Sequence, residues 1–277
     1  MTDSARIEFL EAEAWTQRVQ ALPTELKSRL GTRARRFGRA VAMATPGADV
    51  AVVNRAFGFG LEQPLDAALL TEINAFFRDA GSARWLVECA PHAAILGGRE
   101  TLMKQGGVLK TPTVKLAGEV RDMPDAQPHR GTGRGSVSVA EVGRESSDAF
   151  RTIVGTAFGV PQVIEADIVS AIGQPGWHYY LAFDDGRPIA GAAMFVQDGG
   201  AWFGAAGTSA EARNRGAQTA LLAQRLADAK RLGCSWVTAE TSLDTTEQPN
   251  PSYRNMLRLG LRVAYLREKW VFENTRA

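Results

Sequence analysis

The sequence predicts an α/β (α+β) chain with two similar domains in tandem, each built on a mixed, mostly antiparallel, twisted sheet flanked by helices. Its 277 residues, 45% of them hydrophobic and 22% charged, suit two packed domains of roughly 130 residues each. A weak internal repeat relates the two halves. The second half also shows hairpin patterns followed by a strand–helix–strand crossover, the order of elements in one mixed sheet.

The repeat consists of a helical stretch, a glycine turn and a strand that begins with tryptophan. Trp85 begins this strand in the first half and Trp236 in the second, and a short helix ending in Gly106 or Gly260 follows at nearly the same spacing. Residues 121–135, rich in proline, glycine and charge, separate the copies. We therefore expect a first domain at residues 1–125, a linker at 126–134 and a second domain at 135–277.

The elements of the second half follow from its apolar periodicity and its turn residues. Asp-Gly dipeptides at 185–186 and 198–199 predict two hairpin turns, because this dipeptide tolerates positive φ. Gly233 ends a long amphipathic helix that has Arg225 among its apolar positions. The expected order is helix 147–158, helix 163–172, strands 179–183, 189–197 and 201–208, helix 216–232, strand 235–241, helix 252–259 and strands that end at Phe272.

Charge and composition exclude several classes of protein. Lys plus Arg (32) nearly balances Asp plus Glu (30), so the net charge of +2 gives no electrostatic reason to bind nucleic acid or an anionic membrane. No apolar run approaches the roughly 18–20 residues of a membrane span, and the first residues lack an apolar signal core, so we expect a cytoplasmic protein. Two distant cysteines and three histidines without ligand spacing predict neither a disulfide framework nor a metal site.

The segment richest in chemical information joins strand 201–208 to helix 216–232. The first amides of a helix have no intrahelical acceptor and carry the positive end of its dipole, so an anion such as pyrophosphate fits there. Gly216 and Ala217 remove side-chain bulk, and Arg213 and Arg215 could add charge-assisted hydrogen bonds. These residues taken alone are equally consistent with an ordinary solvent-exposed helix start.

Residues 213–218, Arg-Asn-Arg-Gly-Ala-Gln, resemble the signature Arg/Gln-x-x-Gly-x-Gly/Ala of the GNAT superfamily of acetyl-coenzyme A dependent N-acetyltransferases. Gln218 departs from it, because the family usually has Gly or Ala there. The resemblance implies acetyl-CoA as co-substrate, direct attack of an acceptor amine on the thioester, and no covalent enzyme intermediate. It implies pantetheine pairing with the backbone of Ala206, Gly207 and Thr208. It further implies contacts to the pyrophosphate or the rest of CoA from Arg213, Asn214, Arg215, Gly216, Ala217, Gln218, Thr219 and Asn255.

The groups that move protons are harder to assign. An alkyl amine with a pKa near about 10.4 must lose a proton before it attacks, at a cost of about 4–5 kcal/mol at pH 7. Glu240, at the end of strand 235–241, is the expected base; the alternative is a strand-end carboxylate bonded to backbone or arginine, as the equivalent Glu88 suggests. Met256 stands where the family usually has a tyrosine acid. Because methionine cannot act as an acid, Tyr253 and Ser252 are the candidates in its place, although Ser252 suits a helix N-cap equally well.

The first half lacks an arginine-bearing turn. After an expected strand at 51–59 its turn at 60–66 is acidic, and an acidic turn would repel pyrophosphate. We therefore expect a degenerate GNAT copy without a donor site, in which Asn54, Arg55 and Phe57 could contact the acceptor. The plain interpretation of Phe57, Phe59, Phe76 and Phe77 is that they belong to the core.

The predicted function is acetylation of a primary amine, on a small molecule or a protein, with no metal, nucleic acid or membrane involved. Two alternatives stay open. One is a non-catalytic module that binds or senses acyl-CoA, and the other is an interaction scaffold that has lost CoA binding. The acceptor cannot be identified from the sequence, and formation of a homodimer is also left open.

Overall fold

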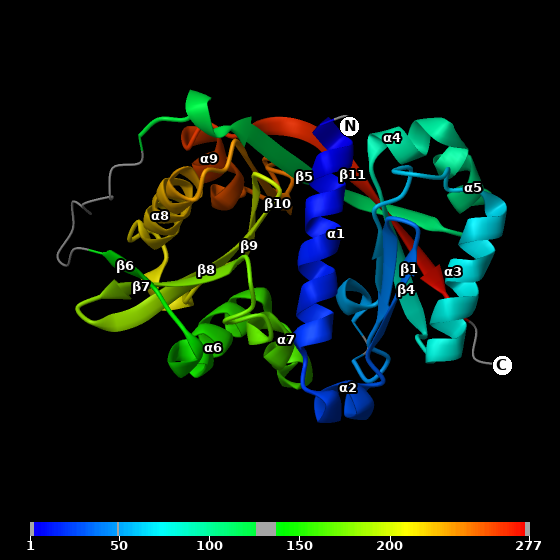
Figure 1. Ribbon diagram of the computed structural model, residues 1–277, viewed down its shortest axis with the longest axis horizontal. Coiled ribbons are helices and arrows are strands. Elements are labelled where there is room, and N and C mark those ends of the chain that lie inside the picture. The colour runs from blue at the N-terminus through cyan, green and yellow to red at the C-terminus, as the bar shows by residue number, and fades with distance from the viewer. Residues whose placement is uncertain (1–2, 49, 126–136, 275–277) are drawn as a thin grey trace. The chain divides into compact units, whose positions relative to one another are not determined.

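The computed structural model describes residues 3–48, 50–125 and 137–274 (Figure 1). The chain forms two compact units: residues 1–115 with 264–277, and residues 116–263. These limits differ from the expected domains 1–125 and 135–277, because the last strand of the chain pairs within the first unit. The expected linker 126–134 lies outside the described residues. Among those residues, no helix has the length and apolar character to cross a bilayer.

The first unit has the strand order β1-β2-β3-β4-β11. All neighbours are antiparallel except β3 and β4, which are parallel and are joined by helix α3. Helices α1 and α3 lie on opposite faces of these strands (Figure 1). The elements are α1 (Asp3–Ala21), α2 (Thr24–Leu30), β1 (Arg33–Phe37), β2 (Ala40–Ala44), β3 (Arg55–Phe57), α3 (Ala67–Ala80), β4 (Arg84–Cys89), α4 (Pro91–Ala93), α5 (Arg99–Lys104), β5 (Val108–Glu119) and β11 (Arg262–Glu273).

The expected strand at 51–59 is wrong in extent. A 3₁₀ turn occupies Ala51–Val53, and only Arg55–Phe57 form strand β3. Asn54 explains the break: its side-chain amide donates to the carbonyls of Ala48 and Val50 and its oxygen accepts from the amide of Thr45, so it organises the preceding loop. Phe57, Phe59, Phe76 and Phe77 are buried, which confirms their core interpretation. Asn54 and Arg55 are buried as well, so the suggestion that Asn54, Arg55 and Phe57 contact an acceptor is wrong.

Helix α1 is an element that the sequence analysis missed. Its buried face includes Glu8 and Glu11 beside apolar residues such as Ile7 and Leu10, so the apolar periodicity that predicts a helix is interrupted. The two carboxylates are matched by cations from the strands: Arg267 Nη1 lies 2.7 Å from Glu11, which also pairs with Lys115, and Tyr265 donates to Glu8 at 2.6 Å. Pairing of this kind offsets much of the cost of burying a charge.

The second unit has the strand order β10-β9-β8-β7-β6, antiparallel except for the parallel pair β9 and β10. Helix α8 lies on one face of these strands and α6 on the other (Figure 1). The elements are β6 (Ser138–Glu141), α6 (Ser147–Phe158), α7 (Glu165–Val169), β7 (Trp177–Asp184), β8 (Arg187–Gln197), β9 (Gly200–Thr208), α8 (Ala217–Arg231), β10 (Trp236–Ser242) and α9 (Pro251–Arg258). They match the predicted elements closely, with two exceptions: strand β6 was not predicted, and one strand, β11, replaces the several strands expected before Phe272.

The predicted internal repeat is confirmed. Each unit has a parallel strand–helix–strand crossover, β3-α3-β4 in the first and β9-α8-β10 in the second. Each crossover helix is followed by a glycine with positive φ, Gly81 at 82° and Gly233 at 76°, a conformation that side chains disfavour. The tryptophan that leads each following strand, Trp85 or Trp236, is buried.

Candidate functional site

Strands β9 and β10 separate beyond the middle of the second unit. They pair in register only from Gly200 to Phe203 on β9, opposite Trp236 to Ala239 on β10. Strand β9 continues to pair with β8 as far as Thr208. The edge of β9 that faced β10 therefore has no strand partner among the described residues from Gly204 onward, and its backbone groups border the opening.

A β-bulge lies where this separation begins. Gly191 of β8 is opposite Gly207, but Ala193 is opposite Gly204, so β9 has one more residue than β8 between these pairs. Ala205, in this interval, has a φ of 43°, which is uncommon for a residue with a side chain. Bulges of this kind bend a strand and re-aim the residues that follow.

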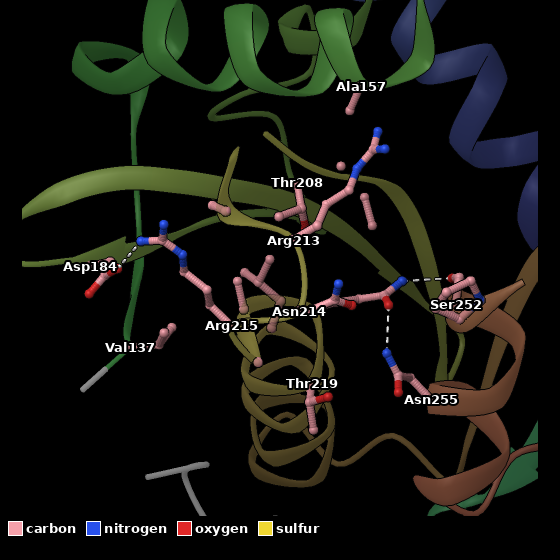
Figure 2. Close-up of a pocket in the computed structure, with 18 of the residues that line it drawn as sticks. Val137, Ala157, Asp184, Thr208, Arg213, Asn214, Arg215, Thr219, Ser252 and Asn255 are labelled. Carbon is pink, nitrogen blue, oxygen red and sulfur yellow. Dashed lines mark hydrogen bonds and ion pairs between the residues drawn. The ribbon is translucent and has the colours of Figure 1, made fainter. Parts of the chain in front are cut away.

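The opening leads into a cavity of about 1060 Å³ (Figure 2). Its walls are the end of β9, the turn that follows, the first turn of α8 and the start of α9. The structure brings the predicted donor-site residues together around this one cavity. They are Ala206, Gly207, Thr208, Arg213, Asn214, Arg215, Gly216, Ala217, Gln218, Thr219 and Asn255, and Ser252 also lines it.

The start of α8 presents backbone donors to the cavity. Gly216 precedes the helix with a φ of 82°, and no side chain caps the helix here. The first intrahelical bond runs from the amide of Ala220 to the carbonyl of Gly216 at 2.9 Å, so the amides of residues 217–219 lack intrahelical acceptors. An anion placed at this end of the cavity would meet these amides and the positive end of the helix dipole.

The two arginines of the turn differ in their contacts. Arg215 Nη1 lies 3.0 Å from Asp184 Oδ2, so its charge is partly compensated. The side chain of Arg213 makes no hydrogen bond or ion pair within the described part of the chain, and it extends toward Ala157 (Figure 2). Arg213 thus supplies a positive charge to the cavity that no described carboxylate neutralises.

Gln218, the departure from the family signature, links α8 to α9. Its Nε2 donates to Ser252 Oγ at 2.7 Å, and its Oε1 accepts from Asn255 Nδ2 at 2.7 Å (Figure 2). The N-cap of α9 is Asn250, which accepts from the amide of Tyr253 at 3.2 Å, so the expectation of Ser252 as a cap is wrong.

The candidates for proton transfer are less clearly placed. Glu240 directly follows Ala239, the last residue of β10 that pairs with β9, and is half-buried. Neither Glu240 nor Tyr253 belongs to the residues that line the cavity. The described residues include no group of three or more His, Cys, Asp and Glu side chains arranged to hold a metal ion.

The sequence analysis also missed several residues of the cavity wall. Asp184 comes from the β7–β8 hairpin and Asn250 from the start of α9. The Asn-Pro pair at 250–251 is a helix-start signal that could have identified Asn250 as the cap. Asp184 has no local signal, because its partner Arg215 is 31 residues away in the sequence.

Comparisons with known proteins agree with this geometry. Residues 148–260 match the family model described as the acetyltransferase (GNAT) family. A solved GCN5-related N-acetyltransferase from Kribbella flavida is 20% identical, with a TM-score of 0.64 over 99% of this chain and 97% of that one. A tandem GNAT protein from the clavulanic acid biosynthesis pathway is 13% identical, with a TM-score of 0.60 over 96% of each chain. A search of curated proteins finds no match.

At these identities the structural likenesses establish the fold, and the family match concerns the second half of the chain. The GNAT structures span both units, as the predicted tandem arrangement requires. The chain therefore has the fold of tandem GNAT proteins, and its residues 148–260 match the acetyltransferase (GNAT) family model.

Proposed function

We propose that the second unit binds acetyl-CoA in the cavity beside β9 and transfers its acetyl group to a primary amine. The observation that supports this proposal most strongly is that β9 separates from β10 beside the start of α8, a helix start with no side-chain cap. This arrangement combines an unpaired strand edge, three unpaired helix amides and an unneutralised arginine along one cavity. Those groups are the donors and acceptors that an extended ligand with amides at one end and phosphates at the other requires.

Different parts of the cavity would bind different parts of acetyl-CoA. The backbone of Ala206, Gly207 and Thr208 would pair with the pantetheine amides as an added strand does. Arg213 and the amides of residues 217–219 would hold the pyrophosphate. Gln218 would fix the distance between α8 and α9, since its side-chain amide is already bonded to both Ser252 and Asn255.

For the chemical step, acetyl-CoA supplies an activated acetyl group, and the chain supplies orientation and proton transfer. A backbone amide at the β9 bulge would polarise the thioester carbonyl. Glu240, at the mouth of the strand opening, would accept the proton of the acceptor amine through water. Ser252 accepts a hydrogen bond from Gln218, which leaves its own hydroxyl hydrogen as a donor for the departing thiolate; Tyr253 is the alternative acid.

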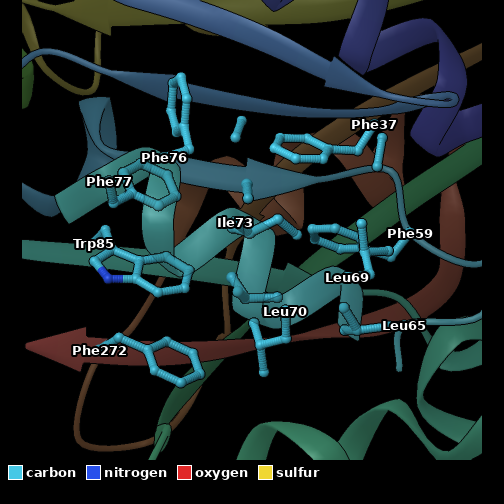
Figure 3. Close-up of a cluster of buried hydrophobic side chains, with 14 of the residues drawn as sticks. Phe37, Phe59, Leu65, Leu69, Leu70, Ile73, Phe76, Phe77, Trp85 and Phe272 are labelled. Atoms are coloured by element: carbon cyan, nitrogen blue, oxygen red, sulfur yellow. The ribbon is translucent and has the colours of Figure 1, made fainter. Parts of the chain in front are cut away.

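We further propose that the first unit is a degenerate copy that has lost the donor site. His92 of α4 donates from Nε2 to the carbonyl of Phe59 at 2.8 Å, just beyond β3, where the second unit has its open strand edge. A Cβ on Gly60 would lie 2.9 Å from the His92 ring and 3.0 Å from Ala93 Cα, so the space is filled. Under α3, Phe77, Trp85 and Phe272 form a continuous stack with ring centroids 4.4 Å apart (Figure 3).

Calorimetric titration with acetyl-CoA tests the proposal. We expect one site per chain, and we expect Gly216→Glu to weaken binding by at least about 100-fold, because it places a carboxylate and side-chain bulk at the anion end of the cavity. Gly233→Glu is the matched control: it adds the same side chain at a positive φ, at the other end of α8 and outside the cavity. Equal losses in both variants, or no binding by the wild type, would contradict the proposal.

A non-catalytic acyl-CoA sensor is the second candidate function. It is favoured by Met256 at the place of the usual tyrosine acid and by the absence of Glu240 and Tyr253 from the cavity wall among the described residues. Thiol release from acetyl-CoA in the presence of a broad panel of amines separates the two functions. Turnover with any amine supports the enzyme, whereas tight binding without turnover across the panel supports the sensor.

A further inference from the structure

Arg225 is a buried arginine in the middle of α8 that the proposed chemistry does not use. It is 1% exposed, and no carboxylate among the described residues pairs with it. Burial lowers the pKa of Arg225 to about 10, so the guanidinium is still charged at neutral pH. A charge held this deeply without a carboxylate is costly, and an apolar side chain of similar length would fill the same volume at lower cost.

The contacts of Arg225 converge on the place where β8 and β9 change register. Its Nη1 donates to the carbonyl of Ala193 on β8 at 3.1 Å, and its Nε donates to the carbonyl of Leu221 at 3.2 Å. The guanidinium lies over the ring of Phe203 on β9, 4.7 Å from the centroid. Arg225 therefore contacts one residue of each strand, on the side where the register is still regular.

These two residues mark the start of the bulge. Ala193 is opposite Gly204, and the next register pair, Gly191 with Gly207, includes the extra residue of β9. Phe203 is also the last β9 residue that pairs with β10. The bulge contains the unfavourable positive φ of Ala205, so the surrounding structure has to hold it in place.

We propose that Arg225 is a positioning residue that fixes the β9 bulge and so orients the strand edge that receives the pantetheine arm of the acyl donor. This inference rests on the proposed donor site. Arg225 does not line the cavity and reaches the two strands through Ala193 and Phe203, while its third contact, with the Leu221 carbonyl, lies within its own helix. Its effect is confined to the strand end of the site, because the phosphate end is formed by the first turn of α8 and by Arg213.

The test compares two probes that share only one end of the site. Coenzyme A spans both ends, whereas adenosine 3′,5′-bisphosphate keeps the 3′-phosphate and the 5′-linked phosphate of the pyrophosphate but has no pantetheine. We expect Arg225→Met to weaken calorimetric binding of coenzyme A by about tenfold and to change binding of the bisphosphate by less than about twofold. Arg225→Lys keeps the charge and one donor, and we expect it to recover about half of the loss on a logarithmic scale.

Leu226→Ala is the control for general loosening of the core, since Leu226 is fully buried in the same helix and its truncation leaves a cavity. All titrations are made well below the melting temperature of each variant. The inference is overturned if the ratio of the affinity for coenzyme A to the affinity for the bisphosphate is the same as in the wild type in both Arg225→Met and Arg225→Lys. It is also overturned if Leu226→Ala reduces coenzyme A binding selectively to the same extent. Lack of coenzyme A binding by the wild type would overturn the proposed donor site itself, a result distinct from both.

Discussion

Helices α3 and α8 are the crossover helices of the two units, and they begin in opposite ways. In α3 the side chain of Asp66 accepts a hydrogen bond from the amide of Leu69 at 2.9 Å, so a carboxylate already satisfies the helix start. In α8 the corresponding residue is Gly216, which has no side chain to offer. The place at the helix start where an anion could bind is therefore occupied by a carboxylate in the first unit and open in the second. We call these the closed and the open anion position.

The difference extends to the interiors of the units. The first unit encloses a network of paired charges, in which Arg267 Nη2 lies 3.1 Å from Glu88 and Arg55 Nη1 lies 3.2 Å from the same carboxylate. The second unit encloses Arg225, which is held by carbonyls and a ring beside the strand bulge. The two crossovers thus share their backbone arrangement, whereas the interior beside one holds paired charges and the interior beside the other holds a single arginine next to an open strand edge.

Disruption of the buried charge network of the first unit should have the largest effect, a loss of stability that the second unit does not show. Arg267→Met removes a cation that Glu11 and Glu88 share in the buried network, and we expect a loss of about 3–5 kcal/mol in the free energy of unfolding by urea. Arg254→Met in the second unit removes a more exposed pair with Asp244 and serves as the control, with no measurable change expected. Similar losses in both variants would mean that the network has no special weight.

Acid should act on the same network. Burial raises the pKa of Glu11, but the charges of Arg267 and Lys115 outweigh this and hold it well below the ordinary value. Its contribution to stability is therefore present above pH 4.5 and is lost as the pH falls through the folded-state pKa. We expect Glu11→Gln to remove about 2 kcal/mol of the pH dependence between pH 7 and 3, measured by urea unfolding. If the free energy of unfolding of Glu11→Gln depends on pH as steeply as that of the wild type, Glu11 is not the source of this pH dependence.

The next prediction concerns the open anion position of the second unit. Arg213→Ala should weaken acetyl-CoA binding by about tenfold, and it should make the affinity less sensitive to salt, because a charge-assisted contact is lost. Titrations at two ionic strengths measure both quantities. Arg262→Ala removes an exposed arginine outside the cavity and should leave the affinity and its salt dependence unchanged.

The closed position of the first unit can be opened in turn. Asp66→Ala should cost about 1 kcal/mol of stability through loss of the α3 cap, whereas Asp66→Asn should retain most of it. Neither change should create a second acetyl-CoA site, because His92 and Ala93 still fill the strand edge. Thermal unfolding and calorimetric stoichiometry provide the two readouts, and two sites per chain would refute the proposed loss of the donor site.

The smallest effect is expected at the bulge. Ala205→Gly should raise the stability of the protein by up to about 1 kcal/mol, since glycine adopts a positive φ without steric cost. Ala206→Gly is the matched control and should lower stability by a similar amount. Ala206 has an ordinary φ, so glycine relieves no strain there and only raises the entropy of the unfolded chain. Thermal unfolding of the two variants should therefore give shifts of opposite sign.

The sequence predicted the second unit well because its signals are local. Asp-Gly turns, a helix that ends at Gly233 and the arginine turn each occupy a few consecutive residues. The contacts that the sequence missed join distant residues, as in Arg215 with Asp184 and Gln218 with Ser252. Helix α1 was missed for a related reason: Glu8 and Glu11 look like surface residues until their partners, more than 100 residues away, are in place.

The ion pairs between α1 and β11 also set an order for folding during synthesis. Residues 116–263 form a unit that is continuous in sequence, so it can fold as soon as it leaves the ribosome. The first unit needs Tyr265 to donate a hydrogen bond to Glu8, Arg267 to pair with Glu11, and β11 to pair with β4. The half of the protein that is translated first is therefore the half that completes its fold last.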